Sequence, residues 1–184
     1  MVLDSSNSIS ELCKCFDFAI EKTLPKAFIK MRMASLYSKI SGDSLSENFA
    51  SLWFSSLFTY DFSTCLSMHM LDMFLLGGWE YAIKMGLALM KLHEGMVFIL
   101  AQLLKAQFED VFQLCGKFGQ SKISDNEILK TVKSIDLRSE IKNRINRAFE
   151  GDSLTAEYAV YVVLSAITEG GSSPLINGLL IIKM

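Results

Sequence analysis

The stretch of residues 49–92 constrains the fold of this chain most, because it combines a dense aromatic cluster with clear signs of helix ends. Its first apolar residues recur at helical spacing but cover more than one narrow stripe, which predicts a helix buried on at least two sides. These residues are Phe49, Leu52, Trp53, Phe54, Leu57 and Phe58. Ser63 can cap a second helix, Gly77-Gly78 can end it, and a third helix begins at Trp79. The rest of the chain is therefore expected to pack around this stretch.

Helix boundaries are also visible on the N-terminal side of this stretch. Ser8 or Ser10 can cap a first helix that ends near Thr23. Pro25 can open the next helix, because the amide hydrogen that proline lacks would be unpaired in a first turn anyway. This second helix is expected to run to Ile40.

Two capping-box patterns predict the starts of further helices. Ser44 with Glu47 precedes the aromatic helix, and Ser124 with Glu127 precedes a helix later in the chain. Residues 137–150 then form the most basic predicted helix.

The composition limits the class of protein. With 184 residues, of which 51% are hydrophobic, the chain is long enough for one domain with a real core. No apolar run approaches the roughly 18–20 residues that cross a bilayer, so a membrane-spanning protein is not expected. The net charge of −2 favours neither nucleic acid nor an anionic membrane as a partner. The excess of apolar residues implies instead that a protein partner covers part of the surface.

The cysteines and the N-terminus indicate a cytoplasmic protein. Cys13, Cys15, Cys65 and Cys115 are scattered, and residues 1–10 lack the charged and apolar regions of a signal peptide. We therefore expect reduced thiols. Cys13 and Cys15 face apart on a helix and are not expected to share a metal ion.

Asp72 is the polar residue in an otherwise apolar helix and lies one turn after His69. The pair would suit a metal or acid–base site, but two residues do not complete a zinc site. The interpretation we favour is a buried, hydrogen-bonded Asp72, because a buried carboxylate needs partners. His93, at a helix junction, is expected to be a cap or a surface group. The sequence thus implies no metal, no cofactor and no catalytic residue.

Basic residues recur on two predicted helices. Lys26 and Lys30 continue a four-residue spacing that starts at Lys22. Such a stripe is ordinarily a solvated helix face, and the alternative is a docking surface. Together with a basic pair near residue 145 and apolar residues near the C-terminus, the stripe defines a candidate partner surface. Its members are Lys26, Lys30, Arg32, Arg144, Arg147, Leu179 and Ile182.

Several residue types at fixed offsets resemble a known family. The pattern is a Leu-Pro pair, an aromatic pair followed by a second aromatic one helical turn on, then an aspartate and a glycine. The residues are Leu24, Pro25, Trp53, Phe54, Leu57, Phe58, Phe62, Asp72 and Gly78. This pattern resembles the second half of a TBC domain, the domain of Rab GTPase-activating proteins, over about residues 11–148. The resemblance implies an all-α array of about eight or nine helices, similar to the C-terminal lobe of that domain.

The resemblance divides the chain into a helical domain of residues 1–150 and an apolar extension of residues 151–184. Residues 155–168 carry a β-branched run that leaves a strand as an alternative, but the all-helical family favours a buried helix. The extension is expected to pack on the domain or on a partner. The absent N-terminal lobe would leave Phe16, Phe28 and Met31 on an uncovered surface.

A TBC domain accelerates GTP hydrolysis with an arginine from Ile-x-x-Asp-x-x-Arg and a glutamine from Tyr-x-Gln. The arginine neutralises charge on the transferred phosphoryl group, and the amide positions the attacking water. Neither motif occurs in this sequence. The resemblance therefore implies a non-catalytic adaptor or structural subunit of a larger assembly, with a Rab-type small GTPase as a candidate partner. The first alternative is part of an active GTPase-activating protein whose catalytic lobe lies on another chain or segment. The second is an unrelated helical bundle.

Overall fold

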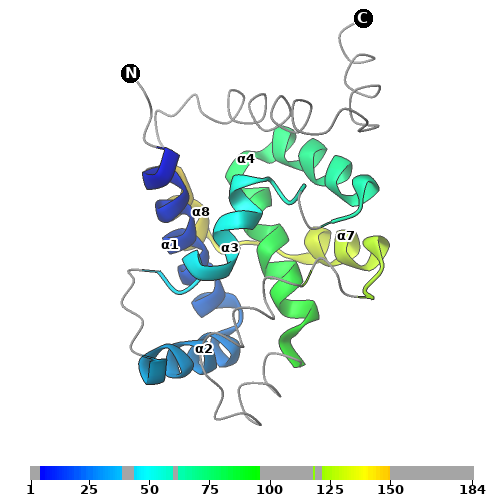
Figure 1. The fold of residues 1–184 in the computed structure, drawn as a ribbon. Helices are drawn as coiled ribbons and strands as arrows, with labels where there is room; N and C mark the ends of the chain where they lie inside the picture. The colour runs from blue at the N-terminus through cyan, green and yellow to red at the C-terminus, as the bar shows by residue number, and fades with distance from the viewer. Residues whose placement is uncertain (1–4, 39–43, 60–61, 96–117, 119–121, 150–184) are drawn as a thin grey trace, which may run out of the picture.

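The computed structural model describes residues 5–38, 44–59, 62–95, 118 and 122–149 (Figure 1). The described residues form α-helices and contain no strand, which confirms the predicted all-α class. The helices are α1 (Ser5–Thr23), α2 (Pro25–Ser38), α3 (Glu47–Ser55), α4 (Thr64–Leu92), α7 (Asp125–Ser134) and α8 (Ser139–Ala148). Part of the predicted total of eight or nine helices falls on residues outside these ranges. The predicted helix of residues 155–168 lies wholly outside them.

Helix α1 shares the centre of the fold with α4. It packs against α2, α3, α4 and α8, and α4 packs against α1, α3, α7 and α8. Figure 1 shows α3 in front of α1 and α8 behind it, with α7 on the far side of α4. Residues 49–92 are therefore not the only centre, because α1 covers one side of the core that α3 and α4 build.

The first two helices meet at Leu24. Helix α1 begins at Ser5, before the predicted caps Ser8 and Ser10, and ends at Thr23 as predicted. Pro25 is the first residue of α2, as predicted, since the first turn needs no amide hydrogen there. The amide of Leu24 donates to the carbonyl of Ile20 at 2.7 Å, so the turn between the helices is tight.

Helix α3 buries one broad face. Phe49, Ala50, Trp53 and Phe54 are buried, whereas the side chain of Leu52 is 46% exposed. The prediction that Leu52 is buried is wrong, whereas the predicted burial of the helix on two sides agrees with its packing against both α1 and α4. The buried face points toward α1 and α4, and nothing equivalent covers the opposite face among the described residues.

The chain reverses direction after α3. Leu57 and Phe58 have φ angles of 46° and 62°, which L side chains rarely adopt, and both side chains are buried. The amide of Phe58 donates to the carbonyl of Trp53 at 2.8 Å. Neither residue continues the helix, contrary to the prediction. Burial of two large side chains offsets the backbone strain.

Helix α4 has two arms that meet at a kink. Ser63 caps the first arm by accepting the amide of Leu66 at 3.2 Å, as predicted. Gly78 interrupts the helix with φ 56° and ψ −146°, so the predicted break at Gly77-Gly78 is confirmed. A Cβ atom on Gly77 would lie 2.1 Å from the Tyr81 ring. Gly78 therefore provides the backbone angles of the kink, and Gly77 leaves space for the Tyr81 ring.

The two predicted capping boxes have different outcomes. Ser124 caps α7 and accepts the amide of Glu127 at 3.3 Å, as predicted. The box of Ser44 with Glu47 is wrong, because Ser46 is the N-cap residue of α3 and makes no side-chain cap. The predicted basic helix begins at Ser139, two residues later than expected.

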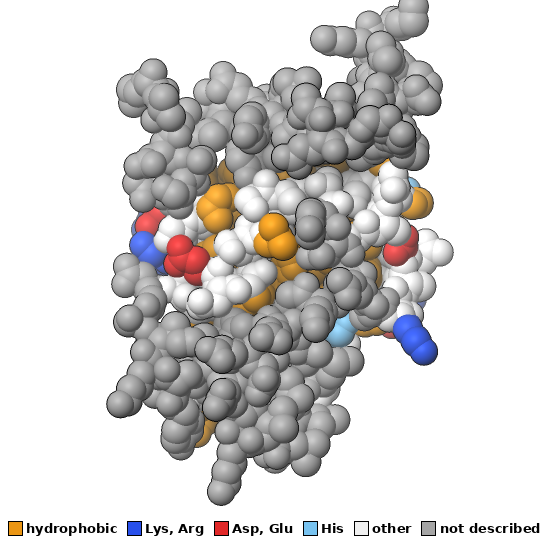
Figure 2. Space-filling model, in the orientation of Figure 1, with side chains coloured by type: hydrophobic (Ala, Val, Ile, Leu, Met, Phe, Trp, Pro, Cys, Tyr) orange, Lys and Arg blue, Asp and Glu red, His pale blue; other side chains and the backbone are white. Residues whose placement is uncertain are grey.

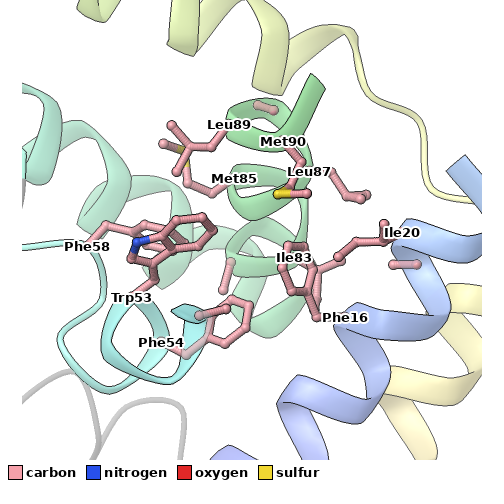
Figure 3. Close-up of a cluster of buried hydrophobic side chains, with 14 of the residues drawn as sticks. Phe16, Ile20, Trp53, Phe54, Phe58, Ile83, Met85, Leu87, Leu89 and Met90 are labelled. Atoms are coloured by element: carbon pink, nitrogen blue, oxygen red, sulfur yellow. The ribbon is translucent and has the colours of Figure 1, made fainter. Parts of the chain in front are cut away.

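Aromatic side chains fill the space between α1, α3 and α4. The Phe16 and Phe54 rings meet edge to face with centroids 5.3 Å apart, as do those of Phe49 and Trp53. Figure 3 shows Phe16, Trp53 and Phe54 beside the second arm of α4, whose side chains reach both toward α3 and toward α1. Phe16, Phe28 and Met31 are all buried, so the expectation that they form an uncovered apolar surface is wrong.

Candidate functional site

The structure places the predicted site residues in different settings. Leu24, Trp53, Phe54 and Phe58 belong to the core. Gly78 forms the kink of α4. These positions of the family pattern therefore support the fold. Leu179 and Ile182 lie outside the described residues.

Asp72 is exposed on the first arm of α4, so the prediction of a buried, hydrogen-bonded carboxylate is wrong. The neighbouring exposed His69 places its Nδ1 atom 2.9 Å from the carbonyl oxygen of Cys65. Leu66, Met70, Leu71 and Phe74 of this arm are buried, and Asp72 lies on the exposed face, which it shares with the exposed side chains of Met68, Leu75 and Leu76. Among the described residues, no group of three or more His, Cys, Asp or Glu side chains could hold a metal ion.

His93 is the C-cap residue of α4, as predicted, but its side chain is buried rather than on the surface. Nδ1 lies 2.8 Å from the carbonyl oxygen of Leu89, and the ring stacks on Phe118 with centroids 3.9 Å apart. Nε2 is buried and has no hydrogen-bond partner within the described ranges. Burial lowers the pKa of His93, because the imidazolium would lose its hydration there, and the hydrogen bond to the Leu89 carbonyl offsets part of this shift.

Asp17 is the polar anchor that sequence reasoning missed. Its carboxylate accepts the amide of Leu45 at 2.7 Å, the hydroxyl of Ser44 at 2.8 Å and the amide of Ser46 at 3.0 Å. Burial raises the pKa of Asp17, and these hydrogen bonds offset part of that effect. The carboxylate thus ties α1 to the start of α3. The sequence signal for this anchor was weak: amides at the start of a helix, here those of Leu45 and Ser46, need an acceptor from outside the helix.

Arg144, a member of the candidate partner surface, makes internal contacts. Its guanidinium lies 4.9 Å from the centroid of the Phe18 ring. Lys22 lies over the same ring at 5.2 Å. Burial raises the pKa of Cys15, although the charge of Arg144 offsets part of this shift. Arg144 therefore links α8 to α1, and Arg147 is exposed on α8.

A groove of about 360 Å³ lies beside the kink of α4. Trp79 and Phe149 stack along it with ring centroids 5.3 Å apart. Leu75 and Leu76, just before the kink, are 58% and 87% exposed. Phe149, the last residue that the structure describes, is one of the residues that line this groove.

The outer face of α2 forms the second open groove, of about 500 Å³. It is lined by Glu21, Pro25, Phe28, Ile29, Arg32 and Met33. Arg32 is the basic residue among those that line the groove, and it is exposed. Lys26 is exposed and Lys30 is half-buried on the same helix, but neither is among these lining residues. The structure thus places one residue of the candidate partner surface of α2, Arg32, beside an apolar groove.

The described surface combines apolar, polar and charged groups. On the face shown in Figure 2, hydrophobic side chains reach the surface between polar atoms, and charged side chains lie mainly toward the edges. No helix among the described residues is long and apolar enough to cross a membrane. The two grooves are features of this part of the chain that suit recognition.

Comparison with known proteins adds one finding. A family model described as the Rab-GTPase-TBC domain matches residues 1–98 of the 184. This range contains α1 to α4 and every residue of the aromatic pattern that resembled the family. No curated protein and no solved structure matches the chain.

Proposed function

This chain belongs to the Rab-GTPase-TBC domain family, and from that premise we propose that it acts by binding rather than by catalysis. Its role is that of a non-catalytic adaptor or structural subunit in a larger assembly. A Rab-type small GTPase is the partner that family membership favours. The setting we propose is the cytoplasm, where the described cysteines would remain free thiols.

One observation carries the proposal. The arginine and glutamine motifs with which the family accelerates GTP hydrolysis do not occur in this sequence. An arginine supplied to the transition state accelerates GTP hydrolysis by about 10³- to 10⁵-fold. A chain that supplies no such arginine is therefore expected to accelerate hydrolysis little. The open groove on α2 supports a binding role, since apolar surface beside charge is typical of recognition sites.

Single-turnover hydrolysis tests the proposal. GTP-loaded Rab-type GTPases are mixed with the purified chain, and phosphate release is followed with and without it. We expect the rate to change by less than about twofold, while biolayer interferometry detects binding to at least one GTPase or to a co-purifying protein.

The same hydrolysis assay also defines the result that would contradict the proposal. An acceleration of about 10²-fold or more that one arginine substitution abolishes would overturn the proposal. The variants to compare are Arg32→Ala, Arg138→Ala, Arg144→Ala and Arg147→Ala.

Family membership also supports a second candidate, in which the chain completes an active enzyme with a catalytic lobe on another chain. In that case acceleration would require a co-purified second chain and would be lost when either is omitted. The same hydrolysis assay, run on the complex and on its separated parts, distinguishes the two candidates.

A further inference from the structure

The groove on α2 follows one stripe of the helix. Four of its lining residues, Pro25, Ile29, Arg32 and Met33, are exposed and recur at spacings of three or four. Phe28, only 9% exposed, lies among them. From position 25 to position 33 the stripe runs about 12 Å along the helix, or roughly two helical turns.

Apolar residues occur on both faces of α2. Ala27 and Met31 are buried, as expected for the inner face of a packed helix. Ile29 and Met33 are 56% and 47% exposed on the outer face. A surface helix normally places polar residues there, so these two side chains are not explained by the core.

The helix that carries the groove is basic. Helix α2 has Lys26, Lys30 and Arg32 and no acidic residue in its sequence, and Arg32 is the one of these three that lines the groove. Glu21, from the end of α1, is the acidic residue that lines the groove. A surface of this kind attracts a partner with negative charge beside apolar side chains.

We infer that the groove on the outer face of α2 binds an acidic amphipathic helix of a partner protein. Apolar side chains of the partner pack on Ile29 and Met33, and its carboxylates face Lys26 and Arg32. Two turns of groove match two turns of a partner helix, the usual mode of helix-in-groove recognition. This inference rests on the proposed binding function and specifies its partner chemistry.

A membrane surface fits the same groove less well. Apolar anchors for a bilayer protrude from a convex surface, whereas here the apolar residues line a concave one. The observations therefore favour a protein helix.

Fluorescence anisotropy with the full chain tests the inference. The probe is a labelled synthetic helix of about two to four turns, with leucine on one face and glutamate on the other; a second probe has lysine in place of each glutamate. We expect the glutamate probe to bind at least about tenfold more tightly at low salt, and salt to weaken its binding.

Matched variants locate the site. Ile29→Ser and Arg32→Glu should each weaken binding of the glutamate probe by about tenfold. The controls are Leu52→Ser, which alters a similarly exposed apolar residue on α3, and Lys130→Glu, which reverses an exposed charge on α7. Both controls should stay within about twofold of the parent. Thermal melts verify that all four variants fold.

Three results would overturn the inference: equal binding of the two probes, equal effects of groove and control variants, or tighter binding to vesicles with anionic lipid than to the glutamate probe. Failure of this inference can be distinguished from failure of the proposed function. A chain that accelerates GTP hydrolysis refutes the proposed function whatever the probes do. A non-catalytic chain that ignores the glutamate probe refutes only the partner chemistry.

Discussion

The aromatic core between α1, α3 and α4 and the outer face of α2 have similar apolar spacing but opposite environments. In the core, Trp53 is 1% exposed and lies edge to face with Phe49. On α2, Ile29 is 56% exposed beside an open groove. Helical spacing alone therefore indicates that a face is apolar, and not whether the chain itself covers it.

The difference matters for energy as well as for position. A side chain in the core loses its packing partners and leaves a cavity when it is shortened. A side chain on the groove loses little until a partner binds. Stability measurements should thus separate the two regions, and the following variants are arranged by the expected size of the effect.

Trp53→Ala should produce the largest loss, about 3 to 5 kcal/mol in the free energy of unfolding, because the indole fills the centre of the core. Urea denaturation measures it. Leu52→Ala, on the exposed side of the same helix, should cost less than about 1 kcal/mol. Similar losses for both would show that the core does not lie on one side of α3.

Gly86→Ala tests how tightly α1 and α4 approach. A Cβ atom there would lie 2.7 Å from the Phe16 ring, so one of the helices must shift. We expect a net loss of about 1 to 2 kcal/mol, although alanine favours the helix. Gly95→Ala is the control, since its Cβ would meet nothing within 4 Å. If Gly86→Ala is as stable as the parent, the contact is looser than described.

The pH dependence of unfolding tests the buried histidine. Burial lowers the pKa of His93 in the folded chain, whereas the unfolded chain titrates near the ordinary value of 6.5. The unfolded state therefore takes up more protons as the pH falls through 6.5, and stability decreases. Above that pH the contribution is fully present. His93→Gln should remove this part of the slope between pH 7.5 and 5.5.

His69→Gln is the matched control for this titration, because His69 is the other histidine of the chain and is exposed. Its slope should follow that of the parent. A parent slope that neither variant changes would mean that His93 is not held neutral in the core.

Ile29→Ser and Asp72→Ala should give the smallest effects, within about 0.5 kcal/mol of the parent, because both side chains are exposed. Chemical denaturation measures both. A decrease of more than about 2 kcal/mol in the free energy of unfolding for Ile29→Ser would show that this side chain belongs to the core. The groove would then not be a docking site.

Sequence reasoning predicted the features that depend on a few neighbouring residues. The start of α2 at Pro25, the caps Ser63 and Ser124, and the break at Gly78 were all expected. Each cap depends on a hydrogen bond within one helical turn. The start at Pro25 and the break at Gly78 each depend on the backbone angles that a single residue can adopt. Such local chemistry does not need the rest of the fold.

The errors share one cause. Ser44 was taken for a helix cap, yet its hydroxyl donates to Asp17, 27 positions away in the chain. Asp72 was placed inside because its neighbours are apolar, but the helix turns it outward. In both cases the outcome depends on a distant segment, which no local pattern describes.

The sequence by itself determined that this chain is helical, where several helices begin and end, and which family it resembles. Only the tertiary structure decided which apolar faces are covered, that Asp17 anchors the start of α3, and that α2 presents an open apolar groove beside Arg32. The physical reason is the distance along the chain over which each kind of interaction acts. Helix periodicity and capping act over a few residues, whereas burial and long-range hydrogen bonds depend on which segments the fold brings together.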